Sequence, residues 1–215
     1  MKTNKRILAI SDIHGNGHLL KELLERAKYS PTEDQLVLLG DYINKGPNSI
    51  GTLQLVSELQ REGAIALIGN NELEWLTQNT KDVKEWIPLL SSLLYWKELN
   101  SFIFVHSSVK KGIPLHRQNK RDLTGLNPPT FDAIPNKVVV FGHTPTFRLG
   151  IAGNQVWLQK GMMGIDTGAG HGYTLSLVDL SAWEVYGVNT FGKPNFTHYS
   201  LEAHIVKAHV LDQSI

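Results

Sequence analysis

The sequence predicts an α/β fold of mixed sheets flanked by helices. Over residues 7–70, short apolar segments that end in polar clusters alternate with segments whose apolar residues recur at helical spacing. This alternation is typical of parallel strands joined by crossover helices. Toward the C-terminus, glycines separate short apolar segments, which favours antiparallel pairing. No repeat, linker or low-complexity segment divides the chain, so we expect one domain over residues 1–215.

The N-terminal segments predict three strands and two helices. Short apolar runs typical of buried strands lie at residues 7–10, 35–39 and 64–68. A helix is expected over residues 19–27, where apolar residues recur at helical spacing and Asn16 is placed to cap the N-terminus. A second helix is expected at residues 50–61. These elements in this order predict a parallel arrangement of the three strands.

The remaining elements follow from the same patterns. Residues 72–94 are mostly helical in character, and residues 102–105 and 138–141 predict two further core strands. Residues 196–210 alternate apolar and polar side chains, which predicts an added edge strand. Shorter strands are expected at residues 156–158, 162–165, 173–178 and 183–188.

Composition excludes several classes of protein. The 215 residues carry a formal net charge of +1, with no basic stripe or tail, so nucleic acid is not an expected partner. No apolar stretch is long enough to span a bilayer, and the first apolar run is too short for a signal peptide. We therefore expect a cytoplasmic protein with no membrane partner. The chain has no cysteine, so any metal must bind His, Asp, Glu or Asn.

Metal-ligand side chains stand at the ends of the five predicted core strands. In chain order they are Asp12 and His14, Asp41, Asn70, His106, and His143. In open α/β sheets, functional groups gather beyond the carboxyl ends of the strands, so these six residues are expected to converge. Oxygen and imidazole donors suit Mn²⁺, Fe, Zn²⁺ or Mg²⁺. A carboxylate such as Asp41 can bridge two ions, and two ions about 3.5–4 Å apart can clamp a phosphate and activate water as hydroxide.

Five motifs resemble those of the calcineurin-like metallophosphoesterases. The match is closest to the bacterial and phage branch of phosphoprotein phosphatases, which includes Ser/Thr protein phosphatases and diadenosine tetraphosphate hydrolases. The resemblance covers about residues 6–180 and implies a sandwich of two mixed sheets flanked by helices. Residues 112–115 and 165–169 also look like this branch. The motifs occur at residues 11–15, 39–41, 69–72, 105–106 and 141–145.

The resemblance implies an enzyme with two divalent metal ions, of which Mn²⁺ is favoured over Fe, Zn²⁺ and Mg²⁺. The implied substrate is phosphorylated: a small molecule, a nucleotide or a phosphoprotein. Asn70 is also expected to contact the substrate. By position, the first metal would be held by Asp12, His14 and Asp41, and the second by Asp41, Asn70, His106 and His143.

The chain departs from the family around this metal cage. Asn71 stands where the family has the histidine that protonates the leaving group, although Glu72 keeps that histidine's acidic partner. Lys45 replaces a phosphate-binding arginine and cannot form its bidentate fork. The segment that usually carries a second phosphate arginine here ends in Asn127. Asp41, Asn71 and Glu72 are thus the catalytic candidates, and Lys45 is the candidate for binding phosphate.

Two functional readings remain open. General acid catalysis is worth about 10²–10⁴-fold, so its loss favours aryl phosphates, phosphotyrosine-like esters, anhydrides and activated diesters over alkyl esters. Alternatively, the chain is a catalytically weak or inactive paralogue that keeps the metals and binds a phosphorylated ligand. Asn71 itself reads as a surface residue, a substitute hydrogen-bond donor or the mark of lost activity. Asp166 is assigned to packing, and His18 and His171 to turns or the surface. Missing positive charge could come from Arg117, Lys120, Arg121 or Arg148.

Overall fold

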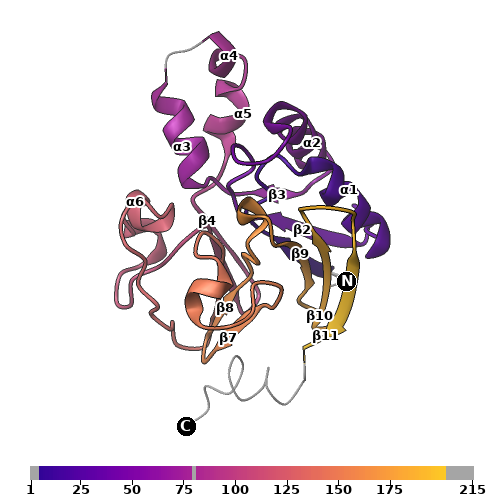
Figure 1. Cartoon of the computed structure of the whole chain (residues 1–215). Coiled ribbons are helices and arrows are strands. Elements are labelled where there is room, and N and C mark those ends of the chain that lie inside the picture. The colour runs from indigo at the N-terminus through magenta and orange to yellow at the C-terminus, as the bar shows by residue number, and fades with distance from the viewer. Residues whose placement is uncertain (1–4, 79–80, 202–215) are drawn as a thin grey trace.

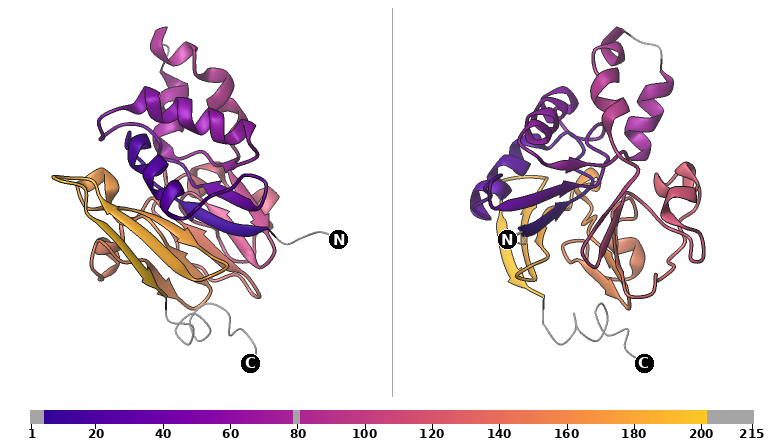
Figure 2. Two further views of the ribbon diagram at one scale, coloured as in Figure 1. Left: turned by 90° about the vertical axis from the view of Figure 1, so that its right-hand side faces the viewer. Right: turned by 180° about the vertical axis from the view of Figure 1, so that it is seen from behind.

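Two mixed β-sheets pack against each other in the computed structural model, which describes residues 5–78 and 81–201. In this part of the chain, one sheet has the strand order β11-β10-β9-β1-β2-β3 and the other has the order β4-β5-β6-β8-β7. Figures 1 and 2 show the two sheets side by side, with helices on the outside. The predicted α/β sandwich of two mixed sheets is therefore confirmed.

The first sheet contains strands from both the N-terminal and the C-terminal part of the chain. Its parallel half pairs β1 with β2 and β2 with β3, and its antiparallel half pairs β1 with β9, β9 with β10 and β10 with β11. The helices α1 and α2 form the crossovers of the parallel half. The elements are β1 (Arg6–Ile10), α1 (Gly17–Arg26), β2 (Asp34–Leu38), α2 (Ser49–Arg61), β3 (Ile65–Ala66), β9 (Thr174–Asp179), β10 (Glu184–Asn189) and β11 (Phe196–Ser200).

The second sheet has three parallel strands at its centre. Strand β6 pairs in parallel with β5 and β8, while β4 and β7 add antiparallel edges. Strand β8 pairs with β6 in parallel, although the glycine-separated segments favoured antiparallel pairing, because β7 runs in the opposite direction and returns the chain before β8 forms. The strands are β4 (Trp96–Leu99), β5 (Phe102–Val105), β6 (Val138–Phe141), β7 (Trp157–Gln159) and β8 (Met162–Gly164).

Shorter helices surround one end of the sandwich. Figure 1 shows α3, α4 and α5 projecting from that end, and together they make residues 72–94 mostly helical, as expected. Within residues 5–78 and 81–201, no helix has both the length and the apolar content that a membrane span needs. The elements are α3 (Asn70–Thr77), α4 (Lys81–Lys84), α5 (Ile87–Ser92), η1 (Leu115–Arg117), α6 (Lys120–Leu123), η2 (Thr146–Leu149) and η3 (Ala169–His171).

Successive side chains of each strand point to opposite faces of the sheet, so the core is divided into layers. In β1, Ile7 and Ala9 face the second sheet, whereas Leu8 and Ile10 pack under α1 and α2. Phe104 of β5 is fully buried in the layer between the sheets. Both faces of β1 are therefore apolar, as expected for a strand covered on both sides. The buried strands end in loops at one rim of the sandwich.

The edge elements differ most from expectation. Strand β4 was not predicted, and the predicted edge strand at residues 196–210 is observed as β11, which ends at Ser200. Residues 202–210 lie outside the described part of the chain. Asn16 occupies the N-cap position of α1, but its amide donates to the carbonyls of Ile13 and His14 instead of its oxygen capping the helix.

Candidate metal centre

The loops that leave β1, β2, β5 and β6 bring the predicted ligands together. Four of these residues adopt the left-handed backbone conformation, with φ values of 52° at Asp12, 45° at His14, 54° at Asp41 and 62° at His143. Non-glycine residues in this region cost free energy, and such strain clusters at functional sites. Backbone bonds hold the strained loops together: the N–H of Asp12 donates to Gly40 (3.1 Å) and that of His14 to Asp41 (2.9 Å).

Two of the histidines are locked with one ring nitrogen facing the centre. Nδ1 of His14 donates to the carbonyl of Ile43 at 2.9 Å, and Nδ1 of His106 donates to the carbonyl of Leu39 at 2.8 Å. Each Nε2 therefore faces the centre, and in the neutral ring it carries the lone pair that binds a metal. Both rings are buried, with exposed fractions of 2% and 0%, so neither can turn freely into solvent.

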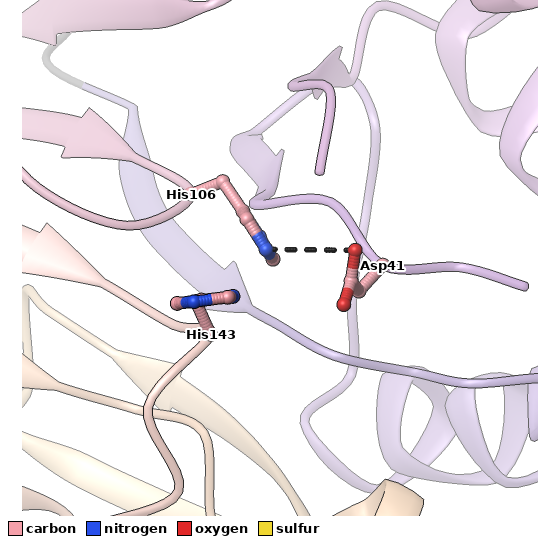
Figure 3. Close-up of side chains that lie close together, drawn as sticks. All are labelled: Asp41, His106 and His143. Carbon is pink, nitrogen blue, oxygen red and sulfur yellow. Dashed lines mark ion pairs between the residues drawn. The ribbon is translucent and has the colours of Figure 1, made fainter. Parts of the chain in front are cut away.

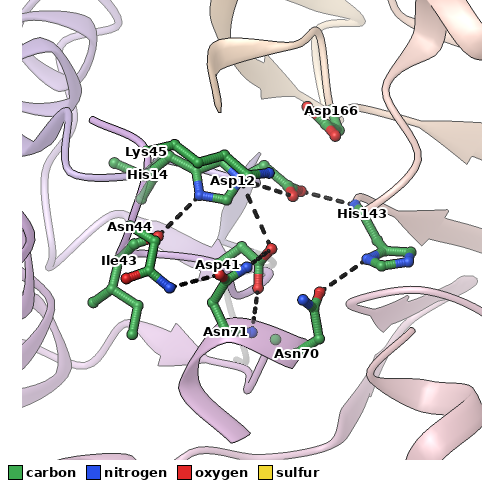
Figure 4. A network of polar contacts seen from close by, with 12 residues as sticks. Asp12, His14, Asp41, Ile43, Asn44, Lys45, Asn70, Asn71, His143 and Asp166 are labelled. Atoms are coloured by element: carbon green, nitrogen blue, oxygen red, sulfur yellow. Dashed lines mark hydrogen bonds and ion pairs between the residues drawn. The ribbon is translucent and has the colours of Figure 1, made fainter. Parts of the chain in front are cut away.

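The ligand atoms form two groups that share Asp41. Oδ2 of Asp41 lies 3.8 Å from Nε2 of His14. Its Oδ1 lies 3.5 Å from Nε2 of His106 (Figure 3). Oδ1 of Asn70 lies 3.2 Å from Nε2 of His106 and 3.0 Å from Nδ1 of His143 (Figure 4). The two groups of carboxylate and imidazole donors are Asp12, His14 and Asp41, and Asp41, His106 and His143.

This donor set fits divalent cations. Several lone pairs converge on the same small space, which is a repulsive arrangement that a cation between them relieves. Burial favours the neutral acid at Asp12, but His106 and His14 nearby hold the pKa of this carboxyl below its ordinary value. Burial and the charge on His106 lower the pKa of His143. Both shifts favour the forms that bind metals, a carboxylate at Asp12 and a neutral imidazole at His143.

Asn71 lies against the shared carboxylate. Its amide Nδ2 donates to Oδ2 of Asp41 at 2.5 Å, and its Oδ1 accepts from the amide of Asn44 at 2.7 Å. The side chain is buried, with 8% exposed, so reading Asn71 as a surface residue is wrong. The backbone N–H of Asn71 also donates to Oδ1 of Asp41 at 3.0 Å. Asn71 therefore fixes both oxygens of the carboxylate that the two ligand groups share.

Glu72 ties the loop after β2 to the loop after β3. Its fully buried carboxylate accepts from the backbone N–H of Asp41 (2.8 Å), Tyr42 (2.8 Å) and Gly69 (2.9 Å). Burial, together with the negative charge of Asp41, raises the pKa of Glu72 to about 7. These contacts make Glu72 a positioning residue for the Asp41 loop.

Lys45 reaches the centre from an exposed backbone position. Its Nζ lies 3.2 Å from Nε2 of His14, the ring nitrogen that faces the first ligand group. The backbone at Lys45 has a φ of 59°, which turns the side chain inward from the loop after β2. Lys45 thus brings positive charge to the rim of the centre, on the side of Asp12 and His14 (Figure 4).

The other candidate residues lie in different surroundings, some buried and some exposed. Asn127 donates to the buried carboxylate of Asp122 at 2.5 Å and accepts from Arg121 at 3.3 Å, so it supports a loop. Burial and the charge of Asp12 raise the pKa of the buried Asp166 well above its ordinary value. His18 lies exposed on α1.

Lys120 and Arg148, two of the side chains that could supply positive charge, have different surroundings. The ammonium of Lys120 stacks over the ring of Tyr95, 4.5 Å from its centroid. Partial burial and the positive charges of Lys45 and Arg148 lower the pKa of His171. Arg117 is exposed on η1. Sequence reasoning did not single out Asn44, whose role becomes visible only once its contact with Asn71 is known.

The fold and the site define a class: α/β sandwich proteins with a cluster of carboxylate, imidazole and amide ligands at the strand ends. Residues 5–159 match the calcineurin-like phosphoesterase family, and the chain belongs to that family. The resemblance seen in the five motifs is thereby confirmed. This family uses divalent metals, in agreement with the ligand groups of the structure.

Curated relatives carry the name symmetrical bis(5'-nucleosyl)-tetraphosphatase. The protein of Thioalkalivibrio sulfidiphilus (strain HL-EbGR7) is 41% identical over 70 residues, which are 33% of this chain and 26% of the relative. That of Ectopseudomonas mendocina (strain ymp) is 31% identical over 119 residues, which are 51% of this chain and 43% of the relative. The chain therefore spans from about a quarter to under a half of the length of these relatives.

Solved structures share the fold at low identity. A candidate diadenosine tetraphosphatase superposes with a TM-score of 0.66 at 21% identity, covering 94% of this chain and 96% of its own. The cold-active protein-tyrosine phosphatase of a Shewanella species superposes with a TM-score of 0.57 at 14% identity, covering 89% and 80% of the two chains. Both likenesses concern the fold alone.

Proposed function

We propose that this protein is a metal-dependent phosphoesterase whose centre holds two divalent cations. The observation that carries the proposal is the position of Asp41. Its two carboxylate oxygens face two different histidines, at 3.8 Å and 3.5 Å, from opposite ligand groups. A carboxylate placed in this way is suited to bridge two cations, which is the arrangement of two-metal phosphate hydrolysis.

The ligands divide between the two cations as the family resemblance implies. Asp12, His14 and Asp41 would hold the first, and Asp41, Asn70, His106 and His143 the second. Such cations polarise a phosphate oxygen and lower the pKa of water. Oxygen and imidazole donors suit Mn²⁺, Fe, Zn²⁺ or Mg²⁺, and we propose Mn²⁺ as the native ion because the family resemblance favours it.

The chain's own side chains orient the phosphate. We propose that Lys45 transfers its contact from Nε2 of His14 to a phosphate oxygen, since its Nζ already lies at the rim of the centre. A lysine supplies a point charge and no bidentate fork. We propose that the amide Nδ2 of Asn70 donates to the substrate, while Oδ1 faces the two histidines.

Asn71 decides which leaving groups are accepted. An amide does not release a proton at neutral pH, and this one donates to Asp41. The leaving group must therefore depart without a protein acid at position 71. We propose that aryl phosphates, anhydrides and activated diesters are turned over faster than alkyl phosphates, because phenolates and phosphates leave unprotonated more readily.

The names of the relatives narrow the substrate. A tetraphosphatase acts on a phosphate anhydride, which needs less acid assistance than an alkyl ester. We therefore propose a phosphorylated small molecule or nucleotide as the substrate, ahead of a phosphoprotein.

A second function is favoured by one contact. If the bond from Asn71 to Asp41 has replaced acid catalysis altogether, the protein would keep its cations and bind a phosphorylated ligand without turning it over. Metal content does not separate the two functions, because both need the cations. Turnover separates them.

The test is the initial rate of hydrolysis of an aryl phosphate and an aryl phosphodiester, measured in Mn²⁺ and in excess chelator. Asp41→Asn is the matched background variant, because asparagine has the same shape and tolerates a φ of 54°. We expect turnover in Mn²⁺ that disappears in chelator and in Asp41→Asn. Equal rates for the wild type and Asp41→Asn would refute the enzyme.

A further inference from the structure

Three aromatic rings form a cluster at the turns η2 and η3. The rings of Phe147 and Tyr173 are stacked, with centroids 4.9 Å apart and an angle of 30° between their planes. The ring of His171 meets Phe147 edge-on at 5.5 Å. We refer to Phe147, His171 and Tyr173 as the ring cluster.

The ring cluster adjoins the candidate metal centre. Gly170, directly before His171, packs against the centre: a Cβ built on it would lie 2.3 Å from Cδ2 of His14 and 2.8 Å from Cδ of Lys45. Any larger residue at position 170 would therefore collide with a metal-ligand ring. The turn that carries His171 thus forms a wall of the centre on the side of His14 and Lys45.

The rings are held in place yet open to solvent. Tyr173 is 49% exposed although its backbone is fixed on both sides, by its N–H to Gly168 (3.1 Å) and its carbonyl from the N–H of Thr190 (2.8 Å). His171 is exposed and Phe147 is half-buried. Rings that only filled the gap between two turns would be buried. Tyr173 stacks on Phe147 and Gly153 lies against the same ring, so the exposed edges of the cluster are suited to meet another planar ring edge to face.

Two positively charged side chains lie beside the ring cluster. The guanidinium carbon of Arg148 lies 5.8 Å from the ring centroid of Phe147, and Lys45 borders the same turn. A molecule with an aromatic ring on the cluster would thus have cations beside the part that carries phosphate. Both substrate types favoured by Asn71, aryl phosphates and nucleotide anhydrides, contain such a ring.

We propose that the ring cluster is the subsite for the aromatic ring of the substrate, with the phosphate at the metal centre and Arg148 beside it. The ligand chemistry is a planar ring joined to phosphate, either a nucleobase or a phenyl group. This assignment rests on the proposed function, because it places the reacting phosphate at the metal centre.

Paired substrates with and without a ring test the subsite. Adenosine triphosphate is compared with inorganic tripolyphosphate, and p-nitrophenyl phosphate with acetyl phosphate, each in the Mn²⁺-loaded protein. The variant is Tyr173→Leu, and Tyr173→Phe is the conservative variant that keeps the ring. Phe131→Leu is the matched control, because Phe131 is 40% exposed and packs on Phe141 and Trp157 away from the cluster.

We expect Tyr173→Leu to lower kcat/KM about fivefold or more for the ring-bearing substrates and to leave the ring-free partners unchanged, since base–aromatic stacking has this strength. Tyr173→Phe should retain the wild-type values. A loss confined to the nucleotide pair assigns the subsite to a nucleobase, and one confined to the nitrophenyl pair to a phenyl group. Equal losses within both pairs, or no loss in either, would overturn the subsite.

A binding measurement keeps this result separate from the proposed function. Equilibrium binding of adenosine monophosphate and phenyl phosphate to the Mn²⁺-loaded protein needs no turnover. Binding that weakens about fivefold or more in Tyr173→Leu, in a protein without hydrolysis, supports the subsite and refutes the enzyme. Hydrolysis with unchanged binding in Tyr173→Leu supports the enzyme and refutes the subsite.

Discussion

Asn71 is central to the proposed chemistry, because the family resemblance implies a proton donor at its position. Its side chain bridges the amide of Asn44 and the carboxylate of Asp41, so it is held in one orientation. A buried amide with both ends satisfied is a stable arrangement. The replacement therefore costs the fold little, and its effect falls on the leaving group.

A histidine at this position should restore acid catalysis. We predict that Asn71→His raises the turnover of an alkyl phosphate by about tenfold or more, at the low end of the usual range because Glu72 is engaged by backbone N–H groups. The rate with an aryl phosphate should change less. Steady-state kinetics on both substrates measures the ratio, and Asn44→His serves as the control that adds the same ring one contact away. A rise of equal size for both substrates would contradict the acid role.

The ligand residues could be predicted from sequence because each follows a short apolar strand in a known order of motifs. The contacts between them could not. Lys45 reaches His14, and Asn44 reaches Asn71, only because the loop after β2 turns through left-handed residues at positions 44 and 45. Such conformations are set by tertiary contacts and leave no periodic signal. The assignment of the six ligands to two cations stays a prediction.

At the scale of the elements, buried strands were predictable and edges were not. Strands β5 and β6 begin and end where their apolar runs do. Strand β4 has the sequence Trp-Lys-Glu-Leu. Because its two central residues are charged, a search for apolar segments does not predict it. Its pairing with β5 is a tertiary effect. The helical stretch after β3 divides into α3, which ends at Thr77, α4, which begins at Lys81, and α5.

The pairing of β1 with β2 depends on an ion pair at their first residues. Arg6 donates to both carboxylate oxygens of Asp34, at 2.8 Å and 2.6 Å. Burial opposes ionisation of Asp34, but the hydrogen bond from Arg6 holds the pKa of this carboxyl below its ordinary value of 3.8. Because the folded-state pKa is lowered, the stabilisation is present above about pH 4 and is lost as the pH falls through the folded-state pKa.

We therefore predict that Asp34→Asn lowers the free energy of unfolding by about 1–3 kcal/mol at pH 7. The difference from the wild type should shrink as the pH falls below 4. Urea unfolding of both proteins across this pH range measures it. Asp132→Asn, at a half-buried carboxylate that accepts one backbone N–H, is the control. A difference that grew on acidification would contradict the sign of the linkage.

At the scale of the whole molecule, the metal centre spans two sheets. Asp12, His14 and Asp41 follow strands of the first sheet, whereas His106 and His143 follow strands of the second. The apolar layer between the sheets therefore sets the distance between the two ligand groups. The sequence predicted both groups, but it could not predict this layer, because which strands face each other is decided by packing.

Shortening a side chain in that layer should affect stability and metal binding together. Phe104 is fully buried between the sheets, and we predict that Phe104→Ala lowers the free energy of unfolding by about 3–5 kcal/mol. The variant should also bind the second Mn²⁺ more weakly than the first. Leu20→Ala, in the layer under α1, is the control that destabilises without moving one sheet against the other. Equal loss of Mn²⁺ affinity in both variants would contradict this account.

The most direct test of a shared, two-cation centre is a titration of Mn²⁺ into chelator-treated protein, with bound metal and the initial rate of aryl phosphate hydrolysis followed together. We predict binding of two equivalents per chain, with hydrolysis appearing as the second equivalent binds. In Asp41→Asn, both binding and hydrolysis should be lost or strongly weakened. Full activity at one equivalent, or hydrolysis that is indifferent to Mn²⁺, would contradict the role assigned to Asp41.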